Sequence, residues 1–343
     1  MPMTRVSFEN DYNVGCHPDL LKVLVETNEV QTTGYGLDPY SQEASVLIKR
    51  ACEAPGADVH FFVGGTQANL TVIAGILKPW QGVISADTGH INTHEAGAVE
   101  ATGHKVLSIP SDDGLLTADE IDCLCRAYAE DPTAEHMVQP GMIYLSQTTE
   151  LGTIYTKPEL TAIREVADRW SLSLYIDGAR LASALTVPGS DLDLVSLAEL
   201  TDVFSIGGTK CGALFGEGVV ITQESLKKDF RSLIKQRGGL LAKGRLIGLQ
   251  FAEFFREDLY LEIGRHMNTM AMTLAEEFRA RHIEFYVPPV SNQLFVILNR
   301  EEAARFKQRA VFEQIDSLDE RRGVFRFVTS YATSRQQIEV LFT

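Results

Sequence analysis

The chain has 343 residues, of which 45% are hydrophobic and 22% are charged, enough for a folded core of about two domains. Its net charge of −15 argues against a nucleic-acid backbone or an anionic membrane surface as the main partner. No apolar run approaches the roughly 20 residues that span a bilayer, and residues 1–11 lack the apolar core of a secretory signal. Five cysteines exclude a disulfide scaffold, so we expect a cytoplasmic protein.

Short apolar stretches alternate with amphipathic ones over most of the chain. We predict strands at residues 60–63, 82–86, 105–109, 142–145, 172–176, 203–206 and 219–222. Helices are predicted at 67–77 and 158–170. This alternation predicts an α/β fold with a mainly parallel sheet covered by helices on both faces. The strand at 219–222 starts eight residues after Cys211, too short a gap for a helical crossover, so it is predicted to run antiparallel to its neighbour.

The pattern changes near residue 240. Long helices are predicted at 242–255 and 259–281, followed by short strands at 293–298 and 324–329. We therefore divide the chain into an N-terminal arm (1–30), a large domain (31–245) and a smaller α+β domain (246–343). The arm, with a short helix at 18–27, resembles neither domain and is expected to lie on a neighbouring surface.

Three predicted strand ends carry residues suited to a charged ligand, and ligands collect at the carboxyl ends of the strands in such sheets. Gly64, Gly65 and Thr66 form a strand-to-helix turn, where free N–H groups attract an anion; a tight turn with a helix cap is the alternative. Asp177 directly follows an apolar strand, so its carboxylate needs a partner. It is a helix cap, a metal ligand or a counter-ion for a protonated ring nitrogen.

Lys210 ends the third strand, beside Gly207 and Gly208. Partial desolvation there would lower the pKa of its amine and make it a nucleophile, and a solvated loop lysine is the alternative. The order of the three sites is what pyridoxal 5'-phosphate requires: a helix N-terminus for the phosphate, a carboxylate for the pyridinium nitrogen and a lysine for the aldehyde. His90 lies between the first two sites and supplies a group to stack on the ring.

With these motifs, the chain resembles the low-specificity L-threonine aldolase and β-eliminating lyase family of fold-type I pyridoxal-phosphate enzymes. The resemblance covers residues 8–329 and rests on the segments 8–12, 35–39, 64–69, 90–97 and 177–181, with 208–212 in place of the family's Ser-Lys-Gly. It implies the mainly parallel seven-stranded sheet of that fold type, with a smaller α+β C-terminal domain.

The resemblance also implies a role for each matching residue. Lys210 would carry the cofactor as a Schiff base, Asp177 would pair with the pyridinium nitrogen, and His90 would stack on the ring and act in proton transfer. The implied cofactor-binding residues are Gly65, Thr66, His90, Asp177, Arg180, Thr209, Lys210 and Lys243. The implied substrate-binding residues are Asp11, Tyr35, Arg180 and Arg326; the two arginines would hold the substrate carboxylate, and Tyr35 would reach the site of a neighbouring subunit. No metal site is expected, although His90, His94 and Glu95 are close in sequence.

Two segments depart from the family pattern. Residues 146–150 read Ser-Gln-Thr-Thr-Glu where the family often has Glu-Asn-Thr-His-Asn, so Thr149 replaces a histidine that contacts the substrate hydroxyl. Threonine cannot act as a base near neutral pH, which leaves His90, the phosphate or a water for that task. Because threonine is smaller than histidine, we expect more room at the β carbon of the substrate and weaker discrimination between its threo and erythro isomers, unless His94 or a water fills the gap. Segment 235–245 matches only in part, and either Lys243 or Arg237 would reach the phosphate of an adjacent subunit.

We predict a pyridoxal-phosphate-dependent aldolase that cleaves L-threonine or a related β-hydroxy-α-amino acid to glycine and an aldehyde. The alternatives are β-elimination to pyruvate and ammonia, transamination of another small L-amino acid, and a protein of this fold that binds without catalysis. The expected partners are the amino acid substrate and further copies of the chain, as a homodimer at least or a homotetramer, with no nucleic acid and no membrane.

Overall fold

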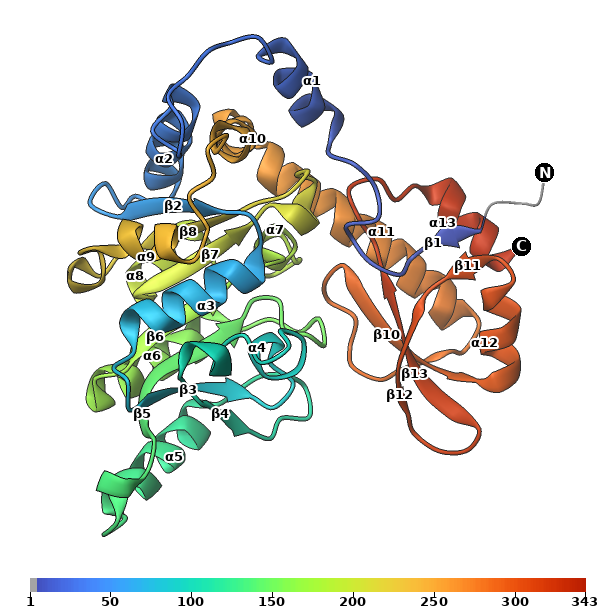
Figure 1. Cartoon of the computed structure of the whole chain (residues 1–343). Helices are drawn as coiled ribbons and strands as arrows, with labels where there is room; N and C mark the ends of the chain where they lie inside the picture. The colour runs from blue at the N-terminus through green and yellow to red at the C-terminus, as the bar shows by residue number, and fades with distance from the viewer. Residues whose placement is uncertain (1–4) are drawn as a thin grey trace.

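Seven strands form the sheet at the centre of the larger part of the molecule (Figure 1), and the computed structural model describes residues 5–343. Their order across the sheet is β2-β8-β7-β6-β5-β3-β4. The strands are β2 (Asp58–Phe62), β3 (Gln81–Ala86), β4 (Val106–Ile109), β5 (Gln139–Ser146), β6 (Ser173–Asp177), β7 (Val203–Gly207) and β8 (Glu217–Ile221). Strand β8 runs antiparallel to β2 and β7, and the other neighbouring pairs are parallel. The mainly parallel sheet and its antiparallel strand are thus confirmed.

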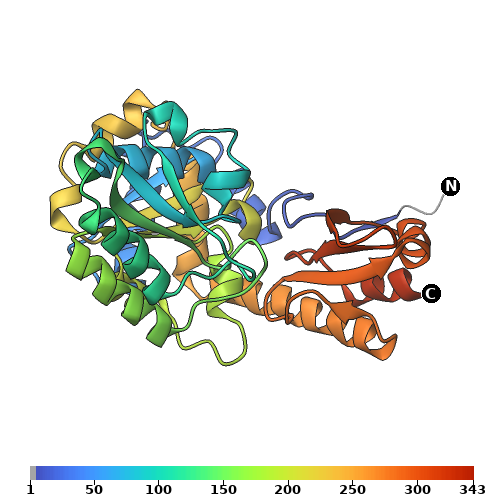
Figure 2. The same cartoon turned by 90° about the horizontal axis from the view of Figure 1, so that it is seen from below.

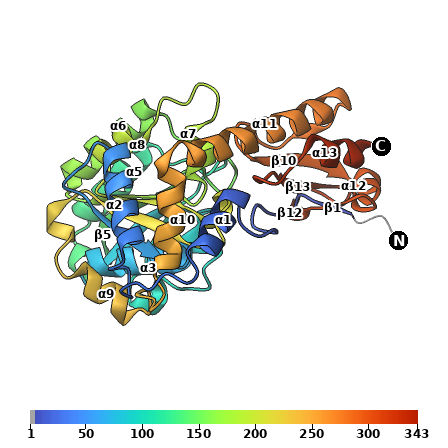
Figure 3. The same cartoon turned by 90° about the horizontal axis from the view of Figure 1, so that it is seen from above.

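Helices cover both faces of this sheet (Figure 3). They are α2 (Pro39–Ala51), α3 (Gly65–Ile76), α4 (His90–Thr93), α5 (Ala118–Glu130), α6 (Lys157–Trp170), α7 (Leu181–Leu185), α8 (Leu194–Leu200), α9 (Phe230–Gln236) and α10 (Arg245–Arg256). Short 3₁₀ turns lie at η1 (Glu100–Thr102), η2 (Ala134–His136), η3 (Thr209–Cys211) and η4 (Glu224–Leu226). Successive strand residues point to opposite faces, so Val219 packs with Val72 of α3, whereas Val220 packs with Ile48 and Phe251 on the other face.

A four-stranded antiparallel sheet, in the order β12-β13-β10-β9, forms the centre of the smaller part. Its strands are β9 (Glu284–Phe285), β10 (Gln293–Asn299), β12 (Glu313–Ser317) and β13 (Arg322–Val328), and the helices beside it are α11 (Leu259–Ala280), α12 (Arg300–Lys307) and α13 (Arg335–Phe342). The predicted strands at 293–298 and 324–329 are therefore confirmed, the second shifted towards its N-terminal side. All five residues of β12 are exposed, and such a polar edge strand lacks the apolar alternation by which strands are recognised.

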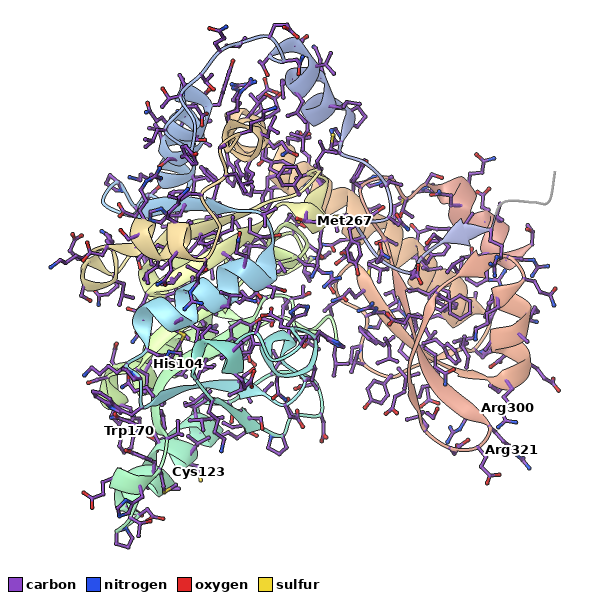
Figure 4. The ribbon with its side chains drawn as sticks, viewed as in Figure 1. His104, Cys123, Trp170, Met267, Arg300 and Arg321 are labelled. Carbon is purple, nitrogen blue, oxygen red and sulfur yellow. The ribbon has the colours of Figure 1, made fainter. Side chains whose placement is uncertain are left out.

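Helix α11 connects the two parts. Met267 packs in the core of the larger part, whereas Met270, one turn later, packs in the core of the smaller part. Figure 4 shows Met267 where α11 passes from one part to the other. Helix α10 packs against α2 and against α1 (Pro18–Glu26). The predicted division after residue 245 assigns α10 to the smaller domain, and that division stays a prediction. In the structure, the residues of α11 pass from the hydrophobic core of the larger part to that of the smaller part between Met267 and Met270.

The N-terminal segment lies on both parts of the chain. Strand β1 (Val6–Ser7) pairs in parallel with β11 (Ala310–Val311) on the smaller part, near the C-terminus (Figure 2). Phe8 is buried in the core of the smaller part. The chain then runs to α1 on the larger part, so Asp11 lies between the two. Among residues 5–343, no helix combines the length and the apolar character needed to cross a membrane.

Candidate active site

The loops that leave β2, β3, β5, β6 and β7 meet at one edge of the large sheet. Gly65, His90, Glu150 and Lys210 lie shortly after the strands that precede them, and Asp177 is the last residue of β6. These residues come together because parallel strands place their carboxyl ends on the same side of the sheet. Strand β8 begins at this same edge because it runs in the opposite direction, and its first residue pairs with Phe62 of β2 and Gly207 of β7.

The anion site predicted at the first strand end has the features that an anion needs. Helix α3 begins at Gly65, and its N-cap residue Gly64 makes no side-chain capping bond to the free N–H groups. A Cβ atom added to either glycine would meet no atom within 4 Å, so the backbone of this turn faces open space. Open space beside unpaired N–H groups at a helix N-terminus fits a phosphate.

Asp177 ends β6 and accepts four hydrogen bonds. Asn69 Nδ2 and Tyr144 Oη donate to Oδ2 at 2.8 and 2.7 Å, while the backbone N–H of Ala179 and the hydroxyl of Ser205 donate to Oδ1 at 3.0 and 3.3 Å. The side chain is 5% exposed. The next helix begins at Leu181 without a side-chain cap, so Asp177 is no helix cap. Four donors around a buried carboxylate fit a counter-ion for a protonated nitrogen.

Lys210 lies in η3, directly after β7. Burial lowers the pKa of its amine, and the neighbouring charge of Arg180 lowers it further, whereas the carboxylates of Asp11, Asp177 and Glu217 oppose this shift. A solvated loop lysine would not have these surroundings. A lysine with a lowered pKa provides the neutral amine that attacks an aldehyde. Thr209, beside it, is held to β8, because the Gly216 N–H donates to its hydroxyl at 3.0 Å.

His90 forms one end of a line of buried polar side chains. Its Nδ1 lies 2.8 Å from Glu95 Oε1, and Asn69 Nδ2 donates to the same oxygen at 2.8 Å. Because Asn69 also donates to Asp177, the line runs from His90 through Glu95 and Asn69 to the carboxylate that ends β6. No cluster among residues 5–343 has the three or more His, Cys, Asp or Glu side chains that a metal ion needs.

Two arginines converge on Asp11. Arg180 donates to it from Nε at 2.7 Å and from Nη2 at 3.1 Å. Arg326 pairs with Glu313, but its buried Nε has no partner. Burial, and then the charge of Arg180, lower the pKa of Arg326. Two neighbouring cations, one with an unpaired donor, fit a second anion such as a carboxylate.

The loop after β5 places a different side chain in the site from the one that the sequence suggested. The Thr149 hydroxyl lies 2.6 Å from that of Thr153 and also accepts from the backbone N–H groups of Leu151 and Thr153. Outside this turn it lies 3.5 Å from the Asp113 carbonyl, so it bonds mainly within its own turn. Glu150 instead reaches the site, where its Oε1 accepts from the His90 backbone N–H at 2.9 Å and from the Ser146 hydroxyl at 2.7 Å. Burial raises the pKa of Glu150.

Tyr35 and Lys243 lie apart from this cluster within the chain. The backbone N–H of Tyr35 donates to Ala242 O at 3.3 Å, and the Lys235 ammonium lies 4.6 Å from the centre of its ring. Lys243 is exposed. No hydrogen bond or ion pair joins either side chain to Lys210, Asp177 or His90. Arg237 lies nearer to α3, since Gln67 Nε2 donates to its carbonyl at 3.1 Å.

Several site residues were not predicted from the sequence. They are Asn69, Glu95, Tyr144, Glu150, Ser205 and Glu217, together with Asn292, whose Nδ2 donates to Asp11 at 3.0 Å. Asn69 and Glu95 lie within segments that carry the family resemblance, so their presence there was a usable signal. The others lie in strands or loops without a distinctive local pattern.

Comparison with known proteins agrees with the resemblance. Residues 25–301 match the family model described as "Beta-eliminating lyase". The low specificity L-threonine aldolase of Pseudomonas aeruginosa is 29% identical over 339 residues, which cover 97% of this chain and 95% of that protein. A solved structure of Leishmania major threonine aldolase is 44% identical with a TM-score of 0.94, and the match covers 98% of each chain.

Aspartate aminotransferase from Thermus thermophilus shares the fold, with a TM-score of 0.72 at 15% identity over 98% of this chain and 90% of that one. The predicted fold type, cofactor and enzyme class are confirmed. The residues at the sheet edge fit the cofactor, since an open helix N-terminus, a buried carboxylate with four donors and a desolvated lysine are its three requirements. The chain therefore belongs to the β-eliminating lyase family of fold-type I enzymes, and it is a lyase that depends on pyridoxal 5'-phosphate.

Proposed function

We propose that the protein cleaves L-threonine, or a related β-hydroxy-α-amino acid, to glycine and an aldehyde. In this reaction the bond between the α and β carbons breaks, the β-hydroxyl loses its proton and becomes the aldehyde carbonyl, and the α carbon gains a proton. Atoms balance without a co-reactant. The proposal is supported by the threonine aldolases to which the chain is similar.

The observation that carries the proposal is the contact of His90 with Glu95. An ionised carboxylate only accepts hydrogen bonds, so Nδ1 of His90 carries the proton in this contact, at 2.8 Å. Its Nε2 is then left with a free lone pair. A neutral imidazole held in this tautomer provides a base for the β-hydroxyl proton.

The bound cofactor supplies an electron sink for the bond that breaks. We propose that Lys210 is its attachment point, that Asp177 keeps its ring nitrogen protonated and that His90 lies against the ring. Gly65, Thr66 and Thr209 would bind the phosphate.

Arg180 and Arg326 would hold the substrate carboxylate, which sets the torsion about the α carbon. Asp11 would position Arg180, through the two hydrogen bonds that join them. Substrate selection is thus assigned to the two guanidinium groups and proton transfer to His90.

We further propose that active sites are shared between subunits of a homodimer or homotetramer. Large apolar side chains are exposed along the N-terminal segment, at Val14, Leu21, Val25, Val30, Tyr35 and Leu37. Such a patch is typical of an interface between proteins. Tyr35, with either Lys243 or Arg237, would then serve the neighbouring site. Light scattering that finds a fully active monomer would reject this assembly.

A cytoplasmic location belongs to the same proposal. It is supported by the five cysteines, all of which are free.

Product analysis tests the reaction. The purified protein, loaded with cofactor, should release acetaldehyde and glycine from L-threonine in equal amounts. Pyruvate from L-serine or L-cysteine, without acetaldehyde from threonine, would favour β-elimination instead. Conversion of a 2-oxo acid with an amino donor would favour transamination.

A further inference from the structure

Glu217 is a buried acid that none of the proposed roles uses. It is the first residue of β8 and is 4% exposed, and its Oε2 has no hydrogen-bond partner. An unpartnered buried carboxylate oxygen is costly, because burial removes water without supplying a donor. In such surroundings a carboxyl is less costly in its protonated, uncharged form than as a carboxylate.

The sheet register places Glu217 between the phosphate turn and Lys210. It pairs with Phe62, three residues before Gly65, and with Gly207, three residues before Lys210. Directly paired antiparallel residues point to the same face, and Phe62 points to the face that α3 covers. Glu217 thus lies on the α3 face, beside the start of that helix.

Backbone bonds fix this arrangement. The carbonyl of Gly216 accepts from the N–H groups of Gly208 at 3.0 Å and of Thr209 at 3.1 Å. The Gly216 N–H donates in turn to the Thr209 hydroxyl. The start of β8 is therefore tied to the residues that lead into Lys210, which fixes the backbone position from which the Glu217 side chain extends.

The charges around Glu217 come from a few elements. Burial raises the pKa of Glu217 to about 8, and the charge of Asp177 on β6 raises it further, whereas the Lys210 ammonium and hydrogen bonding by Thr209 and the Gly208 N–H lower it. Its charge also affects Cys211 in η3, Tyr175 in β6 and Tyr260 in α11. Helix α3 carries no ionisable side chain. Asp58 and His60 of β2 pair further along β8, with Ile221 and Val219.

We propose that Glu217 stays protonated in the loaded enzyme and that, at a pH where the cofactor-free protein has lost this proton, Glu217 takes it up from solvent when the cofactor's phosphate binds at the start of α3. In the free protein its neighbour is the Lys210 ammonium, a compensating charge. A phosphate at the half-buried start of α3 brings about −1.5 to −2 charges beside the first residue of β8, and a like charge nearby disfavours the ionised form of a buried carboxyl. The neutral carboxyl also gains an O–H donor for its surroundings. This inference rests on the proposed phosphate site at Gly65 and Thr66, and not on which amino acid is cleaved.

Infrared spectroscopy of the loaded enzyme tests the proposal directly. At a pH above the pKa of Glu217 in the cofactor-free protein, the native holoenzyme should show the C=O stretching band of a protonated carboxylic acid, which shifts in D₂O, and the cofactor-free protein should lack it. The band should be absent from Glu217→Gln and retained in Glu224→Gln, a control at an exposed position shortly after β8. Absence of the band from the native holoenzyme at this pH would overturn the proposal, and this result does not depend on how any variant folds.

Binding of pyridoxamine 5'-phosphate to the cofactor-free chain measures the coupled proton, since this probe has the phosphate but no aldehyde to react with Lys210. Above the pKa of Glu217, the affinity of the native protein for this probe should fall as the pH rises. The fall should be steeper than in Glu217→Gln by up to about tenfold per pH unit, as expected for the uptake of one proton. Pyridoxamine, which lacks the phosphate, should show no such difference. Equal pH slopes for native protein and Glu217→Gln would contradict the proposal.

A separate variant tests the phosphate site on which the inference rests. Proline is tolerated at the first position of a helix and lacks the N–H, so Gly65→Pro removes one donor from the turn. It should weaken pyridoxamine 5'-phosphate binding about tenfold and leave pyridoxamine binding unchanged. If Gly65→Pro has no effect, the phosphate site is wrong; if it weakens binding while the carboxylic acid band is missing, only the role of Glu217 is wrong.

Discussion

Asp11 and Arg180, 169 residues apart in the sequence, form a buried ion pair with two hydrogen bonds of 2.7 and 3.1 Å. Asn292 Nδ2 donates to the same carboxylate at 3.0 Å. The pair joins the N-terminal segment, the loop after β6 and the strand region of the smaller part at one point. A substrate carboxylate that binds Arg180 must therefore share it with Asp11.

Substitution of Asp11 should destabilise the protein. Asp11→Ala leaves the Arg180 charge buried without its partner, and breaking a buried pair in this way costs about 3–5 kcal/mol. Urea unfolding of the cofactor-free protein measures the loss, with the exposed neighbour Glu9→Ala as the control. A change in Asp11→Ala no larger than that in Glu9→Ala would show that the pair contributes nothing to stability.

The same pair predicts a loss of stability in acid. Burial by itself would raise the pKa of Asp11, but the charges of Arg180 and Lys210 outweigh it and lower the pKa below its ordinary value of 3.8. A lowered carboxyl pKa stabilises the fold above the ordinary value, and this contribution is lost as the pH falls through the lowered one. Stability of the native protein should therefore fall more steeply below pH 3.8 than that of Asp11→Asn. Parallel curves would contradict this.

Lys210→Ala should abolish the visible absorbance of the attached cofactor and almost all activity, and leave the far-UV circular dichroism unchanged. The reason is that its partly desolvated amine is the proposed attachment point. Borohydride reduction of the native enzyme followed by peptide mapping should find the cofactor on Lys210, and a variant of the exposed Lys228, Lys228→Ala, should behave like the native protein in this assay. A label on another lysine would overturn the assignment.

Glu95→Gln should lower kcat by about 10- to 100-fold with little change in KM, since the variant loses the charge that keeps His90 Nδ1 protonated. His90→Ala should cost about 10²–10⁴-fold, as for loss of a general base. The two effects should not add, because Glu95 acts through His90. Full additivity in the double variant, or an unchanged pH profile for Glu95→Gln, would reject the positioning role.

Thr149→Val removes the hydroxyl that accepts from Leu151 and Thr153. It should cost about 0.5–1.5 kcal/mol of stability for each hydrogen bond lost. Because the hydroxyl bonds mainly within its own turn, the ratio of kcat/KM for L-threonine and L-allo-threonine should stay unchanged. Thr149→Ser, which keeps the hydroxyl, is the matched control. A large change in isomer preference for Thr149→Val alone would instead place this side chain at the substrate.

Local patterns accounted for much of the fold. Strands β3, β5, β6 and β7 are apolar runs, and α6 has a capping box between Thr156 and Glu159 at its start, so residues near in sequence predict these elements by themselves. The polar edge strand β12 was not predicted, because an exposed strand has no buried face and hence no alternation.

The amino-acid sequence by itself indicated the cofactor and placed Gly65, Asp177 and Lys210 at or just after the ends of apolar strands, and parallel strands bring their carboxyl ends together. Only the tertiary structure decided which side chains surround them. Asn69 reaches Asp177 across 108 residues, and Glu217 lies beside Lys210 because β8 inserts between β2 and β7 in reverse. Strand order and register set such contacts, and neither is encoded in the local periodicity of the chain.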